Sequence, residues 1–135
     1  MVSGDSVCCV LWLSQLSPLL HVSVVAQIWQ ASRERNARLG LTGAMVFDGE
    51  RFCELLEGDA DELATVCRDI EFDARHIGMR MLYAALTPGA RRLSTWRSGY
   101  CDGADLDVFC GPAGLEGEPA VSAFLDLLGR CSLSN

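Results

Sequence analysis

Glu54 is the residue of this sequence that is best placed to do chemistry. It lies in the run Phe52-Cys53-Glu54-Leu55-Leu56, and strand alternation puts its carboxyl group on the same face as Phe52 and Leu56. A carboxyl group among apolar neighbours either meets a specific partner or stays protonated. Three interpretations of Glu54 remain open: a satisfied buried acid, a contact to a bound ligand, and a surface residue on an edge strand.

Two more polar side chains end the apolar stripes of predicted helices. Asn36 falls on the same stripe as Val25 and Trp29, and Asp73 ends the stripe of a second helix. With the helices side by side and roughly parallel, the amide and the carboxylate would converge at one end of an apolar groove, as in a small-molecule site. An imide N–H could then donate to Asp73, Asn36 could serve a carbonyl group, and Ser14 could add a hydroxyl group. The alternative is that both are ordinary polar residues at solvated helix ends.

Material for acid–base or metal catalysis is scarce in the rest of the sequence. Only two histidines are present, His21 and His76, and no Ser-His-Asp, Cys-His or metal-ligand pattern is found. The seven cysteines are odd in number and lack a C-x-x-C spacing, which favours reduced, mostly buried thiols over a disulfide framework or a zinc site. The sequence therefore predicts no catalytic residues and no metal. Arg91 and Arg92 could meet a phosphate or lie in an exposed turn.

The elements that position these residues follow from periodicity and turn signals. Strands are expected over residues 7–14, 41–47, 51–57, 79–87 and 92–100. A first helix is expected from an N-cap at Ser17 and a first-turn proline, Pro18, to about Arg38, with Gly40 as its stop. A second helix follows a capping box formed by Asp59 and Glu62. Hairpin turns are expected at Asp48-Gly49 and Pro88-Gly89.

This order predicts an α+β fold of the ferredoxin-like kind, a β-α-β-β-α-β-β sandwich with both helices on one sheet face. Residues 6–100 would form this domain. Residues 101–135 would form a C-terminal extension that packs on the other sheet face or on a partner. It has a loop-like stretch over 111–119 and a short amphipathic helix with Val121, Phe124, Leu125 and Leu128 on one face.

Composition excludes several classes of protein. The 135 residues suit one ordinary domain, and half of them are apolar, which argues against disorder. The formal net charge of −7, with eleven arginines and no lysine, argues against a nucleic-acid binder. No apolar run is long enough for a membrane span and no signal peptide is visible, so a cytoplasmic protein without membrane contact is expected.

Four short motifs, in order, resemble the BLUF (blue light using FAD) family. They are N-A-R-x-x-L-T-G from Asn36 to Gly43, F-x-E-L-L-E-G from Phe52 to Gly58, D-x-R-H from Asp73 to His76, and R-R-x-x-x-W from Arg91 to Trp96. The resemblance covers roughly residues 6 to 100. It implies a flavin-binding blue-light sensor in which two helices hold the isoalloxazine ring of FAD.

The resemblance also implies roles for single residues. Asn36 matches a ring-binding asparagine, Asp73 a ring-contacting aspartate, and Ser14 the serine just after the light-active strand position. Arg75 and His76 fill a basic pair. Trp96 matches a tryptophan of the last strand whose position is linked to signalling. His76 could equally interact with its helix end as a charge.

Four positions depart from the family pattern. The reactive tyrosine is replaced by Trp12, the switching glutamine by Glu54, a methionine by Ser98, and a basic or polar ring contact by Asp69. An indole N–H is a donor only, and a carboxyl group lacks the two ends of an amide. Trp12 could be a core aromatic residue or an electron donor. An impaired photocycle is therefore predicted.

The resulting expectation is an FAD-binding sensory module that acts through protein–protein interaction, without enzymatic turnover. Its partner would be a signalling protein regulated in trans, or a second copy of the chain bound through residues 102–135. The alternative is a flavin-free module that keeps the fold for interaction. A small flavin- or heme-dependent enzyme is a third possibility, which the scarcity of acid–base residues disfavours.

Overall fold

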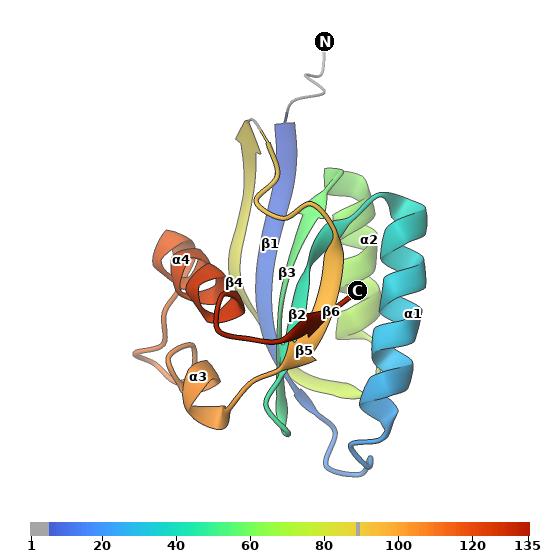
Figure 1. The fold of residues 1–135 in the computed structure, drawn as a ribbon, viewed down its shortest axis with the longest axis vertical. Coiled ribbons are helices and arrows are strands. Elements are labelled where there is room, and N and C mark those ends of the chain that lie inside the picture. The colour runs from blue at the N-terminus through green and yellow to red at the C-terminus, as the bar shows by residue number, and fades with distance from the viewer. Residues whose placement is uncertain (1–5, 89) are drawn as a thin grey trace.

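The computed structural model describes residues 6–88 and 90–135, and its centre is a mixed six-stranded sheet (Figure 1). The strands are β1 (Ser6–Leu16), β2 (Thr42–Phe47), β3 (Arg51–Gly58), β4 (His76–Pro88), β5 (Trp96–Tyr100) and β6 (Leu133–Ser134). They lie in the order β4-β1-β3-β2-β5-β6, with β2 and β5 parallel and the other neighbours antiparallel. β3 is therefore a central strand.

Helices α1 (Val24–Leu39) and α2 (Ala60–Glu71) cover one face of this sheet (Figure 1). The other face carries α4 (Gly117–Leu128), with the short helix α3 (Gly103–Asp107) beside it. The predicted ferredoxin-like sandwich is confirmed. The C-terminal helical tail packs on the opposite face of the sheet, one of its two expected locations.

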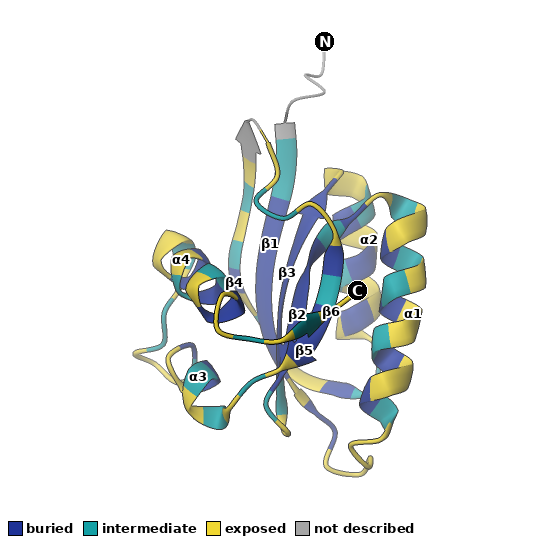
Figure 2. Cartoon of the chain, in the orientation of Figure 1, coloured by how far each residue is buried: buried dark blue, intermediate teal, exposed yellow. Residues whose placement is uncertain are grey.

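Alternate side chains of the central strands enter two separate apolar layers, so these strands are buried along most of their length (Figure 2). The layer under α1 and α2 includes Val10, Trp12, Met45, Phe52 and Leu56 from the strands. The layer under α4 includes Leu11, Val46, Leu55, Phe109 and Phe124. By this alternation Trp12 and Glu54 lie on the sheet face that α1 and α2 cover.

The first helix begins later than predicted. Ser17 and Pro18 form a turn instead, in which the backbone N–H of Leu20 donates to the carbonyl oxygen of Ser17 at 3.0 Å. α1 begins at Val24, after Ser23, whose side chain makes no capping hydrogen bond. The Ser-Pro pair is compatible with either structure, since a serine side chain can also support a turn.

Three other turn and cap signals are confirmed, although α2 has only the Asp59 half of the predicted capping box. Gly40 ends α1 with φ at 68°, a left-handed conformation that glycine adopts without strain. Asp59 caps α2, and its carboxylate accepts from the backbone N–H groups of Asp61 and Glu62 at 3.1 and 3.2 Å. Gly49 turns the β2–β3 hairpin with φ at 103°.

The expectation that the two helices run parallel is wrong. β1 and β2 are both antiparallel to β3, so α1, which connects them, must run opposite to β1. α2 connects β3 and β4, which are both antiparallel to β1, so α2 runs along the direction of β1. The helices are therefore antiparallel (Figure 1), so the C-terminal ends of α1 and α2, near which Asn36 and Asp73 lie in the sequence, point in opposite directions.

The last predicted strand is shorter than expected, since β5 begins at Trp96 and not at residue 92. The backbone N–H groups of Arg92 and Leu93 instead donate to the buried carboxylate of Glu57, at 2.8 and 3.0 Å. Gly89, half of the predicted Pro-Gly turn, lies outside the described residues.

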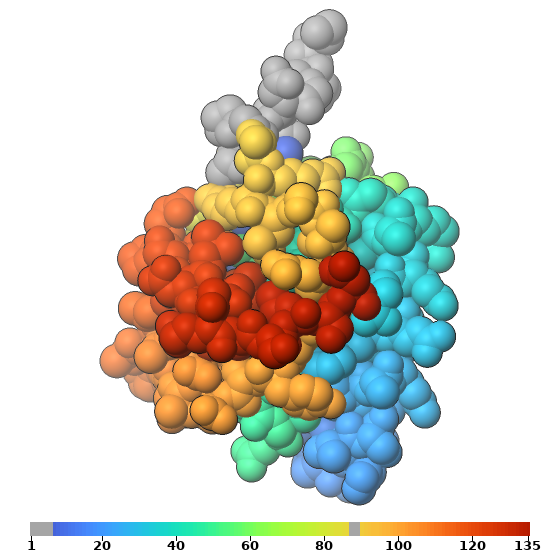
Figure 3. All heavy atoms as spheres, viewed as in Figure 1, coloured from blue at the N-terminus to red at the C-terminus, as the bar shows by residue number. Residues whose placement is uncertain are grey.

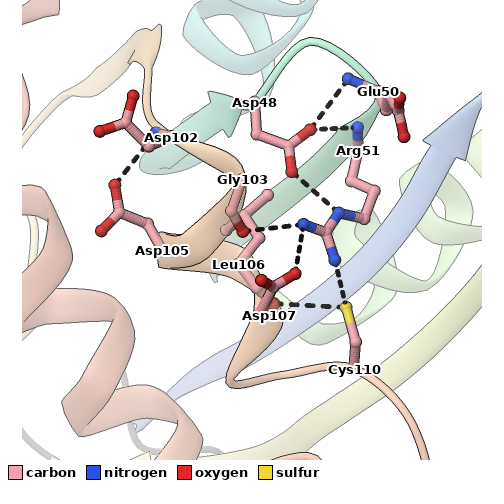
Figure 4. Close-up of polar contacts among 9 residues, drawn as sticks. All are labelled: Asp48, Glu50, Arg51, Asp102, Gly103, Asp105, Leu106, Asp107 and Cys110. Carbon is pink, nitrogen blue, oxygen red and sulfur yellow. Dashed lines mark hydrogen bonds and ion pairs between the residues drawn. The ribbon is translucent and has the colours of Figure 1, made fainter.

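Arg51 attaches the α3 segment to the β2–β3 hairpin (Figure 4). Its guanidinium group donates to Asp48, to the carbonyl oxygen of Gly103, to Asp107 and to the sulfur of Cys110, each at 2.8 Å. The five N–H donors of a guanidinium group allow several acceptors to be bound at once. One side chain of β3 thus orders a short helix that sequence periodicity did not predict.

The C-terminal residues return to the sheet as β6, a strand that the sequence also did not predict. Ser98 pairs with Ser134, and Gly99 with Leu133. A Cβ atom at Gly99 would lie 2.6 Å from the carbonyl oxygen of Ser132, so the approach of the two segments requires glycine. Figure 3 shows these last residues, in red, lying across the face that the extension covers.

Candidate functional site

Four side chains lie in a row across the sheet face that α1 and α2 cover. Trp12 of β1 is opposite Glu54 of β3. Met45 of β2 lies between Glu54 and Ser98 of β5. Directly opposed residues point to the same face and interact. Three of the four positions that were predicted to depart from the family pattern thus belong to one row, interrupted only by Met45.

Glu54 is fully buried in a central strand, so it is not a surface residue of an edge strand. Its Oε2 atom accepts a hydrogen bond from Trp96 Nε1 at 2.9 Å, while Oε1 has no partner. Burial raises the pKa of Glu54 from 4.5 to about 7, against the lowering effects of Arg35 and of the Trp96 and Trp12 indoles. Glu54 is therefore a half-satisfied buried acid.

Trp12 is fully buried beneath the two helices. Its ring meets the ring of His76 edge-on, with centroids 5.7 Å apart. Although its indole lies close enough to influence the pKa of Glu54, Nε1 makes no hydrogen bond of acceptable geometry. Trp12 is thus a core residue that retains a free buried donor.

A cavity of about 320 Å³ lies between α1 and the end of α2. Its lining includes Ile28, Ser32 and Arg35 from α1, Met45 from the sheet, Ile70 from α2, and Asp73, Arg75 and His76 from the segment that follows. This volume is at the lower end of the range for small-molecule sites, roughly 300 to 1,000 Å³. Ionisable residues, which also include Glu34 and Arg38 of α1, outnumber the apolar residues of the lining, so this cavity is more polar than most such sites.

The predicted site residues at this end of the groove are already paired with one another. Ser14 Oγ lies 3.0 Å from His76 Nδ1, and Arg75 donates to both carboxylate oxygens of Asp73. Arg75 lowers the pKa of Asp73, and burial lowers the pKa of His76, so the aspartate is charged and the imidazole neutral near neutral pH. The structure brings these four residues together, with Trp12 beside them.

Asn36 lies apart from this group. It is fully buried near the other end of α1, where Oδ1 accepts from Arg35 Nη2 at 3.1 Å and Nδ2 has no partner. It borders a second cavity of about 430 Å³, together with Arg33, Thr42 and Trp96. Asn36 thus does not line the first cavity with Asp73, although its neighbours Arg35 and Arg38 do.

Ser32 and Arg35 line the first cavity and were missed by the sequence analysis. They follow Ile28 by four and seven residues, a spacing that places all three on one helix face. The sequence analysis used the neighbouring stripe of the same helix, through Val25 and Trp29, and so did not include these residues. Met45 was also missed, and its position opposite Glu54 becomes visible only when the hairpin register is known.

Two other positions contribute nothing to the cavity. Asp69 is exposed on α2 and does not line it. Arg91 donates to the carbonyl oxygen of Gly40 at 2.6 Å and to Thr42 Oγ1 at 3.2 Å, so it fastens the β4–β5 connection to the start of β2.

Unsatisfied polar atoms are concentrated near the helices. Among the described residues, the buried side-chain atoms without a hydrogen-bond partner are Trp12 Nε1, Arg33 Nε, Asn36 Nδ2 and Glu54 Oε1. Buried polar groups normally have partners, so such a group of atoms indicates a place for a polar molecule. Trp12 and Glu54 do not line the first cavity, but Met45, which is opposite Glu54, does, so a planar ring there would lie next to their row. Asn36 fits only in part, since one end of its amide is held by Arg35.

Other kinds of site find no support in the residues that the structure describes. No group of three or more histidine, cysteine, aspartate or glutamate residues there could hold a metal ion. The seven cysteines carry free thiols. No helix of residues 6–88 and 90–135 has the length and apolarity to cross a bilayer.

Solved structures with the same fold are numerous. BlrB, a BLUF protein in its dark state, is 28% identical with a TM-score of 0.63, over 93% of this chain and 88% of that one. The photo-activated state of BlsA is 17% identical with a TM-score of 0.72, over 90% and 94%. A bacterial light-regulated adenylyl cyclase is 18% identical with a TM-score of 0.65, over 92% of this chain but 34% of that one.

The chain thus spans about a third of the length of the first multidomain proteins that it resembles. A search of curated protein sequences finds no significant match. The family model described as "Sensors of blue-light using FAD" matches residues 7–99. Because this match covers more than half of the sequence and agrees with the fold, the chain belongs to the BLUF family.

Proposed function

We propose that this protein is an FAD-binding sensory module that signals by protein–protein interaction, with a photocycle impaired by Trp12 and Glu54. The main support is the combination of the cavity between α1 and α2 with two unsatisfied buried polar atoms in the row beneath it, Trp12 Nε1 and Glu54 Oε1. Bound flavin would supply light absorption and accept an electron. An enzymatic reaction is not part of the proposal, and the part of the chain that the structure describes has no group of side chains suited to a metal ion.

The chain's own residues would hold the ring in distinct ways. Ile28 and Ile70 supply apolar walls, and Ser32 offers a hydroxyl group. Asp73 can accept a ring N–H only if it shares its carboxylate with Arg75, which now occupies both oxygens. Ser14 would act through His76, to which it is hydrogen-bonded. Asn36 would have to exchange its contact with Arg35 for one with the ring.

The impairment follows from the hydrogen-bonding capacity of the two replacements. Trp12 can lose an electron, but its indole offers a donor only and cannot receive and return a proton through an oxygen. Glu54 has no amide nitrogen and therefore cannot present an N–H in one state and a carbonyl in another. Its carboxyl group is also held by the indole of Trp96 at 2.9 Å.

Absorbance tests the binding of flavin. The full chain, purified gently and then incubated with excess FAD, is expected to retain the visible spectrum of an oxidised flavin after gel filtration. An Ile28→Trp variant, which fills the cavity from α1, should lose it. A colourless, well-folded wild-type protein after this treatment would contradict the proposal.

A flavin-free interaction module is the second candidate, and one observation favours it. The side chains that would contact the ring already satisfy much of their hydrogen bonding among themselves, as Ser14 with His76 and Asp73 with Arg75. The same reconstitution experiment separates the two. Analytical ultracentrifugation in light and in darkness then tests whether a flavin-bound protein changes its self-association.

Restoring the two replaced side chains tests the impairment. The double variant Trp12→Tyr, Glu54→Gln, loaded with FAD, is expected to gain a reversible red shift after a blue flash, whereas the wild type shows none. Trp29→Tyr is the matched control, because it also converts a tryptophan on the side of α1 and α2. This variant should gain no red shift. A stable red shift in the wild type would refute the assigned effect of Trp12 and Glu54.

A further inference from the structure

The two segments that meet at the outer edge of β5 bring two cysteines into register. Ser98 pairs with Ser134 and Gly99 with Leu133, in antiparallel orientation. Cys101 and Cys131 lie just outside the paired strands, and the same register, extended by two residues in each direction, would set them opposite each other. Opposed residues of antiparallel strands have Cα atoms about 4.5 to 5.5 Å apart, within the range of about 4.4 to 6.8 Å that a disulfide spans.

Other observations agree that the two thiols are close. Cys101 and Cys131 line one cavity of about 210 Å³ at this edge, and both are half-buried free thiols. The charge of Cys131 is the largest electrostatic contribution that raises the pKa of Cys101. The tight contact of Gly99 with Ser132 keeps the two segments together just before they reach these residues.

We propose that Cys101 and Cys131 are a redox site that forms a reversible disulfide with a low-molecular-weight disulfide such as oxidised glutathione. The thiolate of Cys131 attacks one sulfur of the oxidant, giving a mixed disulfide and releasing one thiolate. The thiol of Cys101 then loses its proton to solvent and attacks Cys131 Sγ, releasing the second thiolate. Two protein thiols are oxidised, and one small disulfide is reduced to two thiols.

The surroundings decide the order of these steps. Burial and the carboxylates of Asp48, Asp102 and Asp105 raise the pKa of Cys101 to about 12. Burial and Asp105 also raise the pKa of Cys131, but the neighbouring Arg130 opposes this rise. Cys131 is therefore the more reactive thiol and Cys101 the resolving one.

Cys110 is the nearest competitor in the sequence, but its sulfur is already engaged. It accepts from Arg51 at 2.8 Å and donates to the carbonyl oxygen of Leu106 at 3.3 Å (Figure 4). The disulfide would tie β6 to the end of β5, the strand that carries Trp96. In the reduced protein β6 pairs with β5 through two residue pairs, so the oxidation state of the two cysteines would control how firmly the edge of β5 is covered.

Peptide mapping of the full chain tests the site. The reduced protein is incubated with oxidised glutathione, its remaining thiols are alkylated, and trypsin cleaves after Arg97 and Arg130. Residues 98–130 and 131–135 are expected as one disulfide-linked pair, which dithiothreitol separates. The oxidised protein should also show slower amide exchange at Gly99 than the reduced protein.

Single substitutions identify the sulfur atoms. Cys110→Ser is expected to keep the linked pair, whereas Cys101→Ser and Cys131→Ser should each abolish it and leave a glutathione adduct or a free thiol. Fragment masses of the wild-type linked peptide assign the bond to Cys101 or Cys110 without any variant. A link through Cys110, or glutathione adducts with no link in the wild type, would overturn the proposal.

Discussion

At the scale of single residues, Glu54 has the most consequence because its carboxyl group can change charge where it lies. It is fully buried between two indoles, and its pKa of about 7 means that both forms are populated near neutral pH. The protonated form offers one O–H and one carbonyl oxygen, and the ionised form offers acceptors only. Protonation can thus alter the polarity of the sheet face beneath the cavity.

The pH dependence of stability should report this group. Because the folded-state pKa of Glu54 is raised from 4.5 to about 7, its stabilising contribution is full below pH 4.5 and is lost as the pH rises through about 7. The loss is on the order of 3 kcal/mol, since each pKa unit is worth about 1.4 kcal/mol. Urea unfolding of the wild type and Glu54→Gln at about pH 5 and about pH 8 should show the wild type losing more stability than the variant.

Comparing the wild type with Glu54→Gln cancels the contributions of the other titrating groups to the pH dependence of stability. The lowered pKa values of His76 and Asp73 act in the opposite direction, because they reduce stability as the pH falls. Both residues are present in both proteins, so their effects cancel. Equal pH dependence in the two proteins would show that Glu54 keeps an ordinary pKa.

At the scale of elements, the two helices beside the cavity are held by different devices. α2 begins with a side-chain cap from Asp59, whereas α1 begins without one and ends in the left-handed Gly40. The start of α1 is preceded by exposed apolar residues, such as Leu19 at 93% exposure. α2 therefore has the better-defined start, and the cavity lies against its end.

Removal of the α2 cap should have a measurable cost. Asp59→Ala is expected to lower the free energy of unfolding by about 1 kcal/mol, within a range of roughly 0.5 to 2, because two backbone N–H groups lose their acceptor. Asp69→Ala, an exposed carboxylate of the same helix, is the control and should change it by less than about 0.5 kcal/mol. Similar losses in both variants would mean that charge, and not capping, matters here.

Sequence patterns predicted the elements whose signals are local. The Asp48-Gly49 hairpin, the Gly40 stop and the Asp59 cap depend on backbone geometry that these residue types favour by themselves. β6 and α3 depend on distant contacts, such as Gly99 with Ser132 and Arg51 with Gly103, which no local pattern encodes.

The sequence predicted the strand faces of single site residues better than it predicted how the two helices are arranged around the site. Periodicity put Glu54 on the strand face of Phe52 and Leu56, and these two residues lie in the layer under α1 and α2. It did not determine the relative direction of the helices, which follows only from strand pairing, and so Asn36 was grouped with Asp73. Arg35 was missed because charged residues near a helix end usually face solvent.

At the scale of the whole molecule, the extension is part of the structure and not an appendage. Phe124 of α4 is fully buried in the layer formed by Leu11, Val46 and Leu55 of the central strands. Without α4 this apolar sheet face would be exposed to water. Exposure costs about 25 cal/mol of free energy for each Å² of apolar surface. The sheet is therefore stabilised from both sides.

A truncation within this layer should destabilise the entire protein. Phe124→Ala is expected to lower the free energy of unfolding by about 3 to 5 kcal/mol, the usual cost of removing a buried aromatic ring. Phe72→Ala, whose ring is 80% exposed, is the control and should cost less than about 0.5 kcal/mol. Denaturation followed by circular dichroism measures both. A small effect at Phe124 would mean that the extension folds independently of the sheet.

The added strand β6 also limits how this protein can grow into larger assemblies. It occupies the middle of one margin of the sheet, so the long opposite margin, β4, is the one left for strand exchange with another molecule. Two copies joined margin to margin through β4 would present only capped margins to a third molecule. The outer margins of such a pair would be formed by the two-residue strand β6, which offers little backbone for a third molecule to pair with.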